Sequence, residues 1–126
     1  MLKAFVVGCG GFLGAMARYG LTGLVHSRTD TLFPLGTMVV NVTGCLVIGV
    51  LMSLIEDRQL FSPNVRIFLT IGLLGGFTTF SSLGYETLEL LRAGSMRLAL
   101  WNVLGNVAAG LAAVFAGWSA TRALAG

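Results

Sequence analysis

Long apolar stretches alternate with short polar segments along the whole chain. Four of these stretches, at about 4–25, 35–55, 65–91 and 98–124, are long enough to cross a membrane, since a transmembrane helix needs about 20 mostly apolar residues. Pro34 and Pro63 lie where a proline can open the second and third helices. The pattern predicts an all-α membrane protein, with residues 1–126 forming a single domain of four transmembrane helices.

The third stretch is interrupted near its centre by the run Gly75-Gly76-Phe77-Thr78-Thr79-Phe80-Ser81-Ser82. A glycine pair followed by hydroxyl side chains favours a helix that is broken at its centre. Irregular backbone at that depth is tolerated only where it is buried in protein or lines a wet cavity. The run therefore predicts an ion or solute site beside the break.

Beyond the break, polar positions recur with helical spacing. They are Thr79, Ser82, Glu86 and Glu89. Residues at this spacing lie on one helix face, so they form a polar stripe from the midplane to one surface. The simpler alternative is that the hydroxyls bond to carbonyls of their own helix. That alternative leaves the clustering with the glycine pair unexplained.

Composition agrees with a membrane protein and excludes several classes. Charged residues make up 10% of the chain, against roughly 25% in a soluble domain. The net charge of +3 is scattered and forms no basic cluster, so we expect no nucleic-acid partner. Neither a nucleophile–base constellation nor a metal-binding spacing is present, so we expect no enzyme. Cys9 and Cys45 lie in apolar runs and are interpreted as small buried hydrophobic residues.

The side chains around the break indicate the sign of the ion. A broken helix can offer carbonyls to a cation or amides to an anion. The central thirds of the spans contain no carboxylate. The second and third spans do contain an aromatic ring with an electropositive edge, an amide and several hydroxyl donors, namely Phe80, Asn41, Thr37, Thr79, Ser81 and Ser82. This set favours a small, strongly hydrated anion.

Arg18 is the only charge deep inside the first stretch. A charge in a membrane span is a functional candidate, and Arg18 could concentrate anions at a pore mouth. It could equally be a structural partner for backbone carbonyls or for Glu86. Elsewhere, small residues at helical spacing predict close helix packing: Gly10, Gly14 and Ala17 in the first stretch, Gly105 and Ala109 in the fourth. Asn102 and Asn106 are interpreted as hydrogen-bonding contacts between helices.

Charge balance across the membrane bears on assembly. With an even number of spans, one side holds Lys3, Arg58, Arg66 and Arg122, and the other holds Arg28, Arg92 and Arg97. Four against three gives no orientation preference. Because four helices alone enclose little space, we expect an oligomer. A chain that inserts both ways predicts an antiparallel, dual-topology homodimer in contact with membrane lipid.

Three motifs, in order along the chain, resemble those of the small bacterial fluoride channels (Fluc-type). They are the run from Gly10 to Tyr19, then Gly36-Thr37 with Val40-Asn41 and Gly44, then the run from Gly72 to Ser81 followed by Tyr85-Glu86. The resemblance covers nearly the whole chain. It implies a passive, fluoride-selective channel of the bacterial inner membrane that exports cytoplasmic fluoride through two pores per antiparallel dimer.

The resemblance also implies roles for individual residues. A structural sodium ion at the dimer centre would be held by the backbone carbonyls of Gly75 and Thr78. The fluoride pathway would comprise Asn41, Phe80, Thr37, Thr79, Ser81, Ser82, Leu83 and Glu86, with Arg18 as a vestibule charge. At Leu83 the chain departs from the family pattern, which usually places a second phenylalanine there.

Other classes remain as alternatives. Small multidrug-resistance-type transporters also have four spans and dual topology. They rely on a membrane-embedded glutamate in the first helix, where this chain has Arg18 and no acid. A structural subunit of a larger membrane complex would explain the glycines but not the hydroxyls of Thr78 to Ser82.

Overall fold

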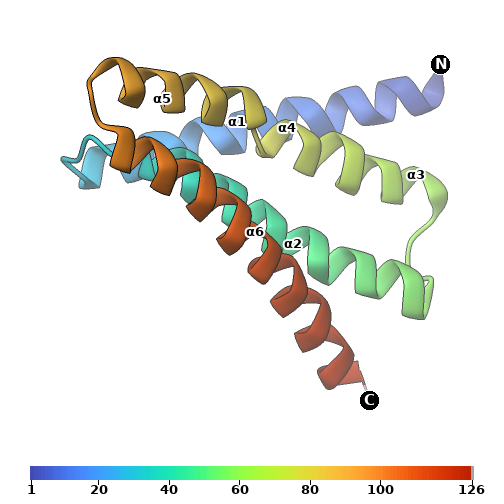
Figure 1. Cartoon of the computed structure of the whole chain (residues 1–126). Coiled ribbons are helices and arrows are strands. Elements are labelled where there is room, and N and C mark those ends of the chain that lie inside the picture. Colours follow the sequence, from blue (N-terminus) through green and yellow to red (C-terminus); the bar gives the residue numbers. More distant parts are fainter. Residues whose placement is uncertain (126) are drawn as a thin grey trace.

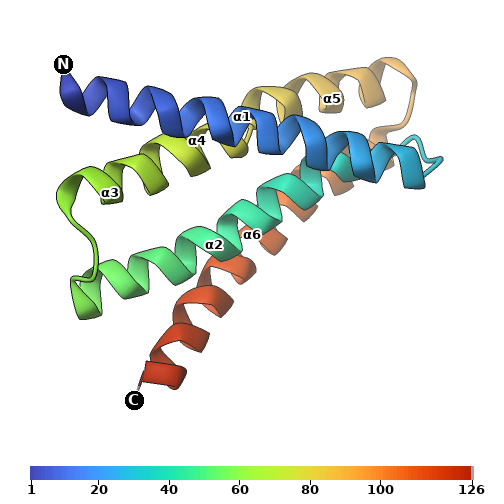
Figure 2. The same ribbon diagram turned by 180° about the vertical axis from the view of Figure 1, so that it is seen from behind.

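The computed structural model describes residues 1–125, and the described chain consists of helices and short connections without a strand (Figures 1 and 2). The helices are α1 (Leu2–Arg28), α2 (Leu35–Arg58), α3 (Pro63–Ile67), η1 (Phe68–Leu74), α4 (Gly75–Phe77), α5 (Phe80–Arg92) and α6 (Met96–Ala125). Elements α3 to α5 together make one apolar span, so the described chain contains four candidate membrane spans, as predicted. Gly126, the last residue of the predicted domain, lies outside the described residues.

The spans form two layers that diverge from one end to the other. In Figures 1 and 2, α1 runs beside α3, η1 and α4, and α2 runs beside α6, against which α5 also packs. The layers lie close together near the α1–α2 and α5–α6 connections, and they spread apart toward the end that holds both termini. Both termini therefore lie at the same end, as an even number of spans requires.

Glycines bring α1 into direct backbone contact with the third span. A Cβ added at Gly10 would lie 2.6 Å from the Phe68 carbonyl oxygen, and one added at Gly72 would lie 2.7 Å from the Val7 carbonyl oxygen. Gly14 faces the backbone of Leu73 in the same way. The packing predicted for Gly10 and Gly14 is confirmed, whereas Ala17, the next small residue of that series, is exposed.

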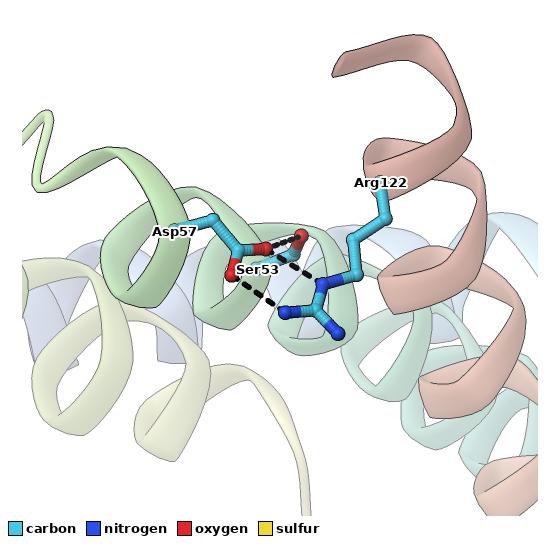
Figure 3. Close-up of polar contacts among 3 residues, drawn as sticks. All are labelled: Ser53, Asp57 and Arg122. Carbon is cyan, nitrogen blue, oxygen red and sulfur yellow. Dashed lines mark hydrogen bonds and ion pairs between the residues drawn. The ribbon is translucent and has the colours of Figure 1, made fainter. Parts of the chain in front are cut away.

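Glycines also allow close backbone contact between α2 and α6, and an ion pair joins the C-terminal ends of these two helices. Gly49 and Gly117 each face backbone atoms of the opposite helix. Near the C-terminal ends of α2 and α6, Arg122 donates to both carboxylate oxygens of Asp57, at 2.7 and 2.9 Å, and Ser53 donates to the same carboxylate at 3.2 Å (Figure 3). Because this ion pair is partly exposed, we expect it to contribute about 1 kcal/mol or less.

The third span breaks two residues beyond the glycine pair. Thr78 and Thr79 are the extended residues, with φ/ψ of −82°/158° and −149°/119°. Gly75 keeps helical angles, −62°/−36°, and Gly76 lies in α4 against the backbone of Gly11. The prediction of a broken third helix is confirmed, but the prediction that the glycines break it is wrong. Gly76 has no side chain because α1 passes too close to allow one.

Burial in this chain is inverted relative to a soluble protein. Large apolar side chains such as Phe5, Phe12, Leu111 and Phe115 are exposed, as expected for surfaces that face lipid. Polar side chains are buried instead, namely Thr37, Ser53, Thr79, Asn102 and Asn106. Since burying polar groups is costly unless they are hydrogen-bonded, these residues mark where the chain has specific internal contacts.

Candidate functional site

The backbone at the break is held by the side chain of Asn41, from α2. The Asn41 Oδ1 accepts the backbone N–H of Thr79 at 2.8 Å, and its Nδ2 donates to the Thr79 carbonyl at 3.1 Å. A single amide thus binds both polar groups of the extended residue. Buried backbone groups need such partners, so Asn41 makes the break possible at this depth.

The break leaves carbonyls at the end of α4 without the amides that a continuous helix would supply. The Thr79 N–H, which would reach the Gly75 carbonyl in an unbroken helix, donates to Asn41 instead. The Ser82 N–H, which would reach the Thr78 carbonyl, donates to Thr79 Oγ1 at 3.2 Å. The Thr79 hydroxyl therefore caps α5. The carbonyls of Gly75 and Thr78, the residues predicted to hold a cation, are among those released in this way.

A polar cavity lies between α1, α2 and α5. Its lining includes Arg18, Thr22, His26, Thr37, Thr79, Ser82 and Glu86. Thr37 donates to Glu86 Oε1 at 2.6 Å and so joins α2 to α5. Thr79 donates to the Ser82 hydroxyl at 3.0 Å. The structure therefore brings Thr79, Ser82 and Glu86 together along one wall, as the helical spacing predicted, and Thr37 of α2 joins them through its bond to Glu86.

Two charged groups of this polar cavity have few partners. Glu86 Oε2 is buried and has no hydrogen-bond partner among the described residues. Arg18, half-buried in α1, lines the same cavity, but within residues 1–125 it forms no hydrogen bond or ion pair. The salt bridge between Arg18 and Glu86 that the sequence left open is therefore not formed in the single chain.

A second hollow, the central cleft, opens between the two layers. Its lining includes Asn41, Gly75, Thr78, Thr79, Phe80, Leu83 and Asn106. Phe80 is 84% exposed, whereas Leu83, one turn further along α5, is 6% exposed. The residues predicted for one pathway thus divide between two hollows, and only Thr79 lines both. The Ser81 hydroxyl is exposed and lies 3.4 Å from Thr79 Oγ1.

The polar cavity continues toward the surface at the α1–α2 connection. A neighbouring hollow shares Thr22, His26, Thr37 and Glu86 with it and adds Thr31 and Glu89. Thr22 and His26 were not singled out by the sequence, although both lie on the α1 face that follows Arg18 at helical spacing. Glu89 extends the polar stripe to this mouth, as the spacing from Thr79 predicted.

The sequence also did not predict how far the polar contacts extend into α6. Asn106 accepts from Asn41 Nδ2 at 3.0 Å, and Asn106 Nδ2 donates to the carbonyl and the side-chain oxygen of Asn102 at 2.9 and 3.2 Å. Asn102 in turn donates to Thr87 of α5 at 3.1 Å. The four-residue spacing of the two asparagines places them on one face of α6. Their connection to Asn41 depends on helix packing that spacing alone does not give.

Four membrane spans, a broken third helix and a buried polar wall beside the break define a small multi-pass membrane protein built around a polar path. The chain belongs to the CrcB-like family: the family model described as "CrcB-like protein, Camphor Resistance (CrcB)" matches residues 5–118. This assignment agrees with the resemblance found in the three sequence motifs. It gives no support to the multidrug-transporter alternative. The protein is a multi-pass protein of the membrane, which in bacteria is the inner membrane.

Individual relatives match over almost the full length of the chain. It is 46% identical to the fluoride-specific ion channel FluC of Solibacter usitatus over 116 residues, which cover 92% of this chain and 95% of the relative. It is 40% identical to the protein of the same name from Clostridium perfringens over 124 residues, 98% of this chain and 97% of the relative. The corresponding values for the protein from Methylobacillus flagellatus are 42%, 123 residues, 97% and 96%. All three relatives are named as channels and not as enzymes.

Proposed function

We propose that this protein is a passive, fluoride-selective ion channel that exports cytoplasmic fluoride. The observation that carries the proposal is the wall of hydroxyls and one carboxyl group in the polar cavity: Thr37, Thr79, Ser82 and Glu86. Membership of a family whose relatives are named fluoride-specific ion channels supports the same function.

The chemistry of the polar cavity suits a small anion. Fluoride must lose part of its hydration shell to enter a narrow path, and hydroxyl donors can replace that water. Arg18 at the wall of the cavity raises the local concentration of anions. An ionised Glu86 carboxylate would repel fluoride in the path. Protonation or a hydroxyl donor would offset this repulsion, and the Thr37 hydroxyl is such a donor. Thr79 connects this cavity to the central cleft, where the edge of the Phe80 ring is the remaining electropositive group.

Sodium fits the two carbonyls at the break. Carbonyl oxygens are suitable ligands for a hard cation, and those of Gly75 and Thr78 have lost their helical amide partners to Asn41 and Thr79. Both residues line the central cleft, where a second copy of the chain would add its own pair. When bound, sodium would supply a fixed positive charge at the break.

A second, antiparallel copy is the occupant we propose for the central cleft. The cleft leaves the polar residues Asn41 and Thr78 partly exposed beside large apolar residues, and polar groups facing lipid are costly. A homodimer would cover them. Because basic residues favour neither side of the membrane, the copies would be antiparallel, and the dimer would contain two symmetry-related fluoride paths.

Reconstitution in liposomes tests the function directly. Purified protein in vesicles loaded with potassium fluoride should release fluoride when valinomycin is added, whereas vesicles loaded with potassium chloride should retain chloride. Protein-free vesicles give the background leak. Equal release of the two anions, or no fluoride release from protein that elutes as a single folded species, would exclude a selective fluoride channel.

A further inference from the structure

A hydrogen-bonded chain of side chains runs through α2, α6 and α5 behind the proposed fluoride path. It begins at the Thr79 N–H, passes through Asn41, Asn106, Asn102 and Thr87, and ends at the Leu83 carbonyl. Its five links measure 2.8, 3.0, 3.2, 3.1 and 2.7 Å. The chain therefore leaves α5 at its N-cap and returns to α5 at Thr87, whose hydroxyl bonds to the Leu83 carbonyl one turn earlier.

Every link has the same polarity. The oxygen of each side chain accepts from the group before it, and its nitrogen or hydroxyl donates to the group after it. Asn106 Nδ2 is also bonded to the Asn102 carbonyl at 2.9 Å, so its amide cannot turn over without losing contacts to α6. The Asn106 oxygen is consequently fixed toward Asn41.

This arrangement determines the orientation of the Asn41 amide. An asparagine Nδ2 has two hydrogens, and those of Asn41 are directed to the Thr79 carbonyl and to Asn106. If the amide turned over, Nδ2 would face the Thr79 N–H and the oxygen would face the Asn106 oxygen. Donor would meet donor and acceptor would meet acceptor. Asn102 is fully buried, and Asn106 is only 6% exposed at the edge of the central cleft, so little solvent is available to replace these contacts.

We propose that Asn106 and Asn102 are positioning residues for the ion path. Through Asn41 they hold the Thr79 backbone in its extended conformation, and through Thr87 they attach α6 to α5 two turns further along. The segment between these two contacts carries Phe80 and Ser82, so α6 fixes the path without lining the polar cavity. The effect on conduction rests on the proposed channel function, whereas the effect on the backbone does not.

The backbone effect is tested by hydrogen exchange of single amides. In ¹⁵N-labelled protein in lipid nanodiscs, Asn106→Leu should speed exchange of the Thr79 amide about five- to tenfold, the size expected for one hydrogen bond between membrane helices. The Thr78 amide, which donates to the Leu74 carbonyl at 2.9 Å, is the internal reference and should be unchanged. Unchanged exchange at Thr79 would overturn the proposal.

The conduction effect is tested with the same variants in liposomes. Asn106→Leu should reduce fluoride efflux about tenfold, and the double variant Asn41→Ala/Asn106→Leu should be no slower than Asn41→Ala alone, because both act on one contact. Thr121→Val is the matched control on α6, since the Thr121 hydroxyl bonds only within its own helix, to the Gly117 carbonyl. Additive losses in the double variant, or a wild-type rate for Asn106→Leu, would contradict a positioning role.

Two further experiments distinguish a folding defect of Asn106→Leu, and a failure of the proposed channel function, from a failure of the positioning role. If Asn106→Leu does not fold, Thr87→Val replaces the last hydroxyl of the chain with a methyl group of similar size, and it should produce smaller changes in the same direction. Wild-type rates and unchanged Thr79 exchange in that variant would again overturn the proposal. If wild-type protein carries no fluoride, the proposed function fails, and the exchange data alone decide whether α6 holds the break.

Discussion

Asn41 does at the break what neighbouring residues do in a continuous helix. It accepts the Thr79 N–H and donates to the Thr79 carbonyl. Both of its amide hydrogens are thereby in use. The place of Asn41 in the fluoride pathway stays a prediction, and the contacts suggest that its influence on the ion would pass through the backbone that it holds.

Phe80 and Leu83 differ in a way that bears on the departure from the family pattern. Both line the central cleft, but only Phe80 is exposed in the single chain, and Leu83 is buried. A leucine has no electropositive ring edge. Phe80 therefore remains the only aromatic group of the pathway that the resemblance implies in this chain.

Phe80→Leu should therefore reduce fluoride efflux from liposomes by about two- to tenfold, since an aromatic contact is worth roughly 0.5–1.5 kcal/mol. The fold of the single chain should be retained, because the ring is mostly exposed there. Phe115→Leu is the control, since Phe115 is 68% exposed on α6. Equal efflux from the two variants would remove Phe80 from the pathway.

At the scale of helices, the sequence predicted the number of membrane-spanning helices correctly but not the exact position of the break within the third one. The helix starts at Leu35 and Pro63 follow from Pro34 and Pro63, which fit only the first turn of a helix. The break was misplaced by two residues because glycine favours both a break and a close contact between helices. Only the position of α1 against Gly72 and Gly76 distinguishes the two roles.

The crossing of α1 over the third span should be sensitive to one methyl group. A Cβ at Gly14 would overlap the Leu73 carbonyl, whereas one at Gly20 would have no atom within 4 Å. Gly14→Ala should lower the free energy of unfolding by about 1–3 kcal/mol, measured by thermal or denaturant unfolding in detergent. Gly20→Ala should be neutral or slightly stabilising. Similar losses in both variants would show that the crossing is not the cause.

For the molecule as a whole, composition and hydrophobic length were sufficient to predict a four-span membrane protein. The candidate site was predicted in part. Helical spacing placed Thr79, Ser82 and Glu86 on one wall, but spacing has no information on contacts between spans. The bond from Asn41 to Thr79 joins residues 38 positions apart, and the bond from Asn41 to Asn106 joins residues 65 apart.

Dual topology predicts that a given loop lies outside the cell in about half of the molecules and inside in the rest. With Cys9 and Cys45 replaced by alanine, Leu60→Cys, at an exposed position between α2 and α3, should be labelled from outside intact cells to about half of its total. Adding Arg28→Ala and Arg97→Ala removes basic charge from the opposite side only, so external labelling should then fall. Labelling of the first variant at nearly none or nearly all of its total would exclude dual topology.

A structural sodium ion predicts that assembly depends on sodium and not on ionic strength. A ligand that binds only the dimer stabilises it in proportion to the logarithm of its concentration once the site is filling. Replacing sodium by choline at constant ionic strength should therefore lower the dimer fraction, counted by single-molecule photobleaching in liposomes. The same dimer fraction in both salts would leave the Gly75 and Thr78 carbonyls without a structural cation.

The π-helix η1 can absorb a change in the length of the third span. Each residue of an α-helix advances the chain by about 100°, and a π-type turn accommodates one residue more than an α-helical turn. Deleting one residue between Phe68 and Leu74 would therefore allow an ordinary α-helical turn to form there while the residues that follow keep nearly their present orientation. The same deletion in α5 would rotate the residues beyond it by nearly a third of a turn, so a change of length is better tolerated in η1 than beside the polar cavity.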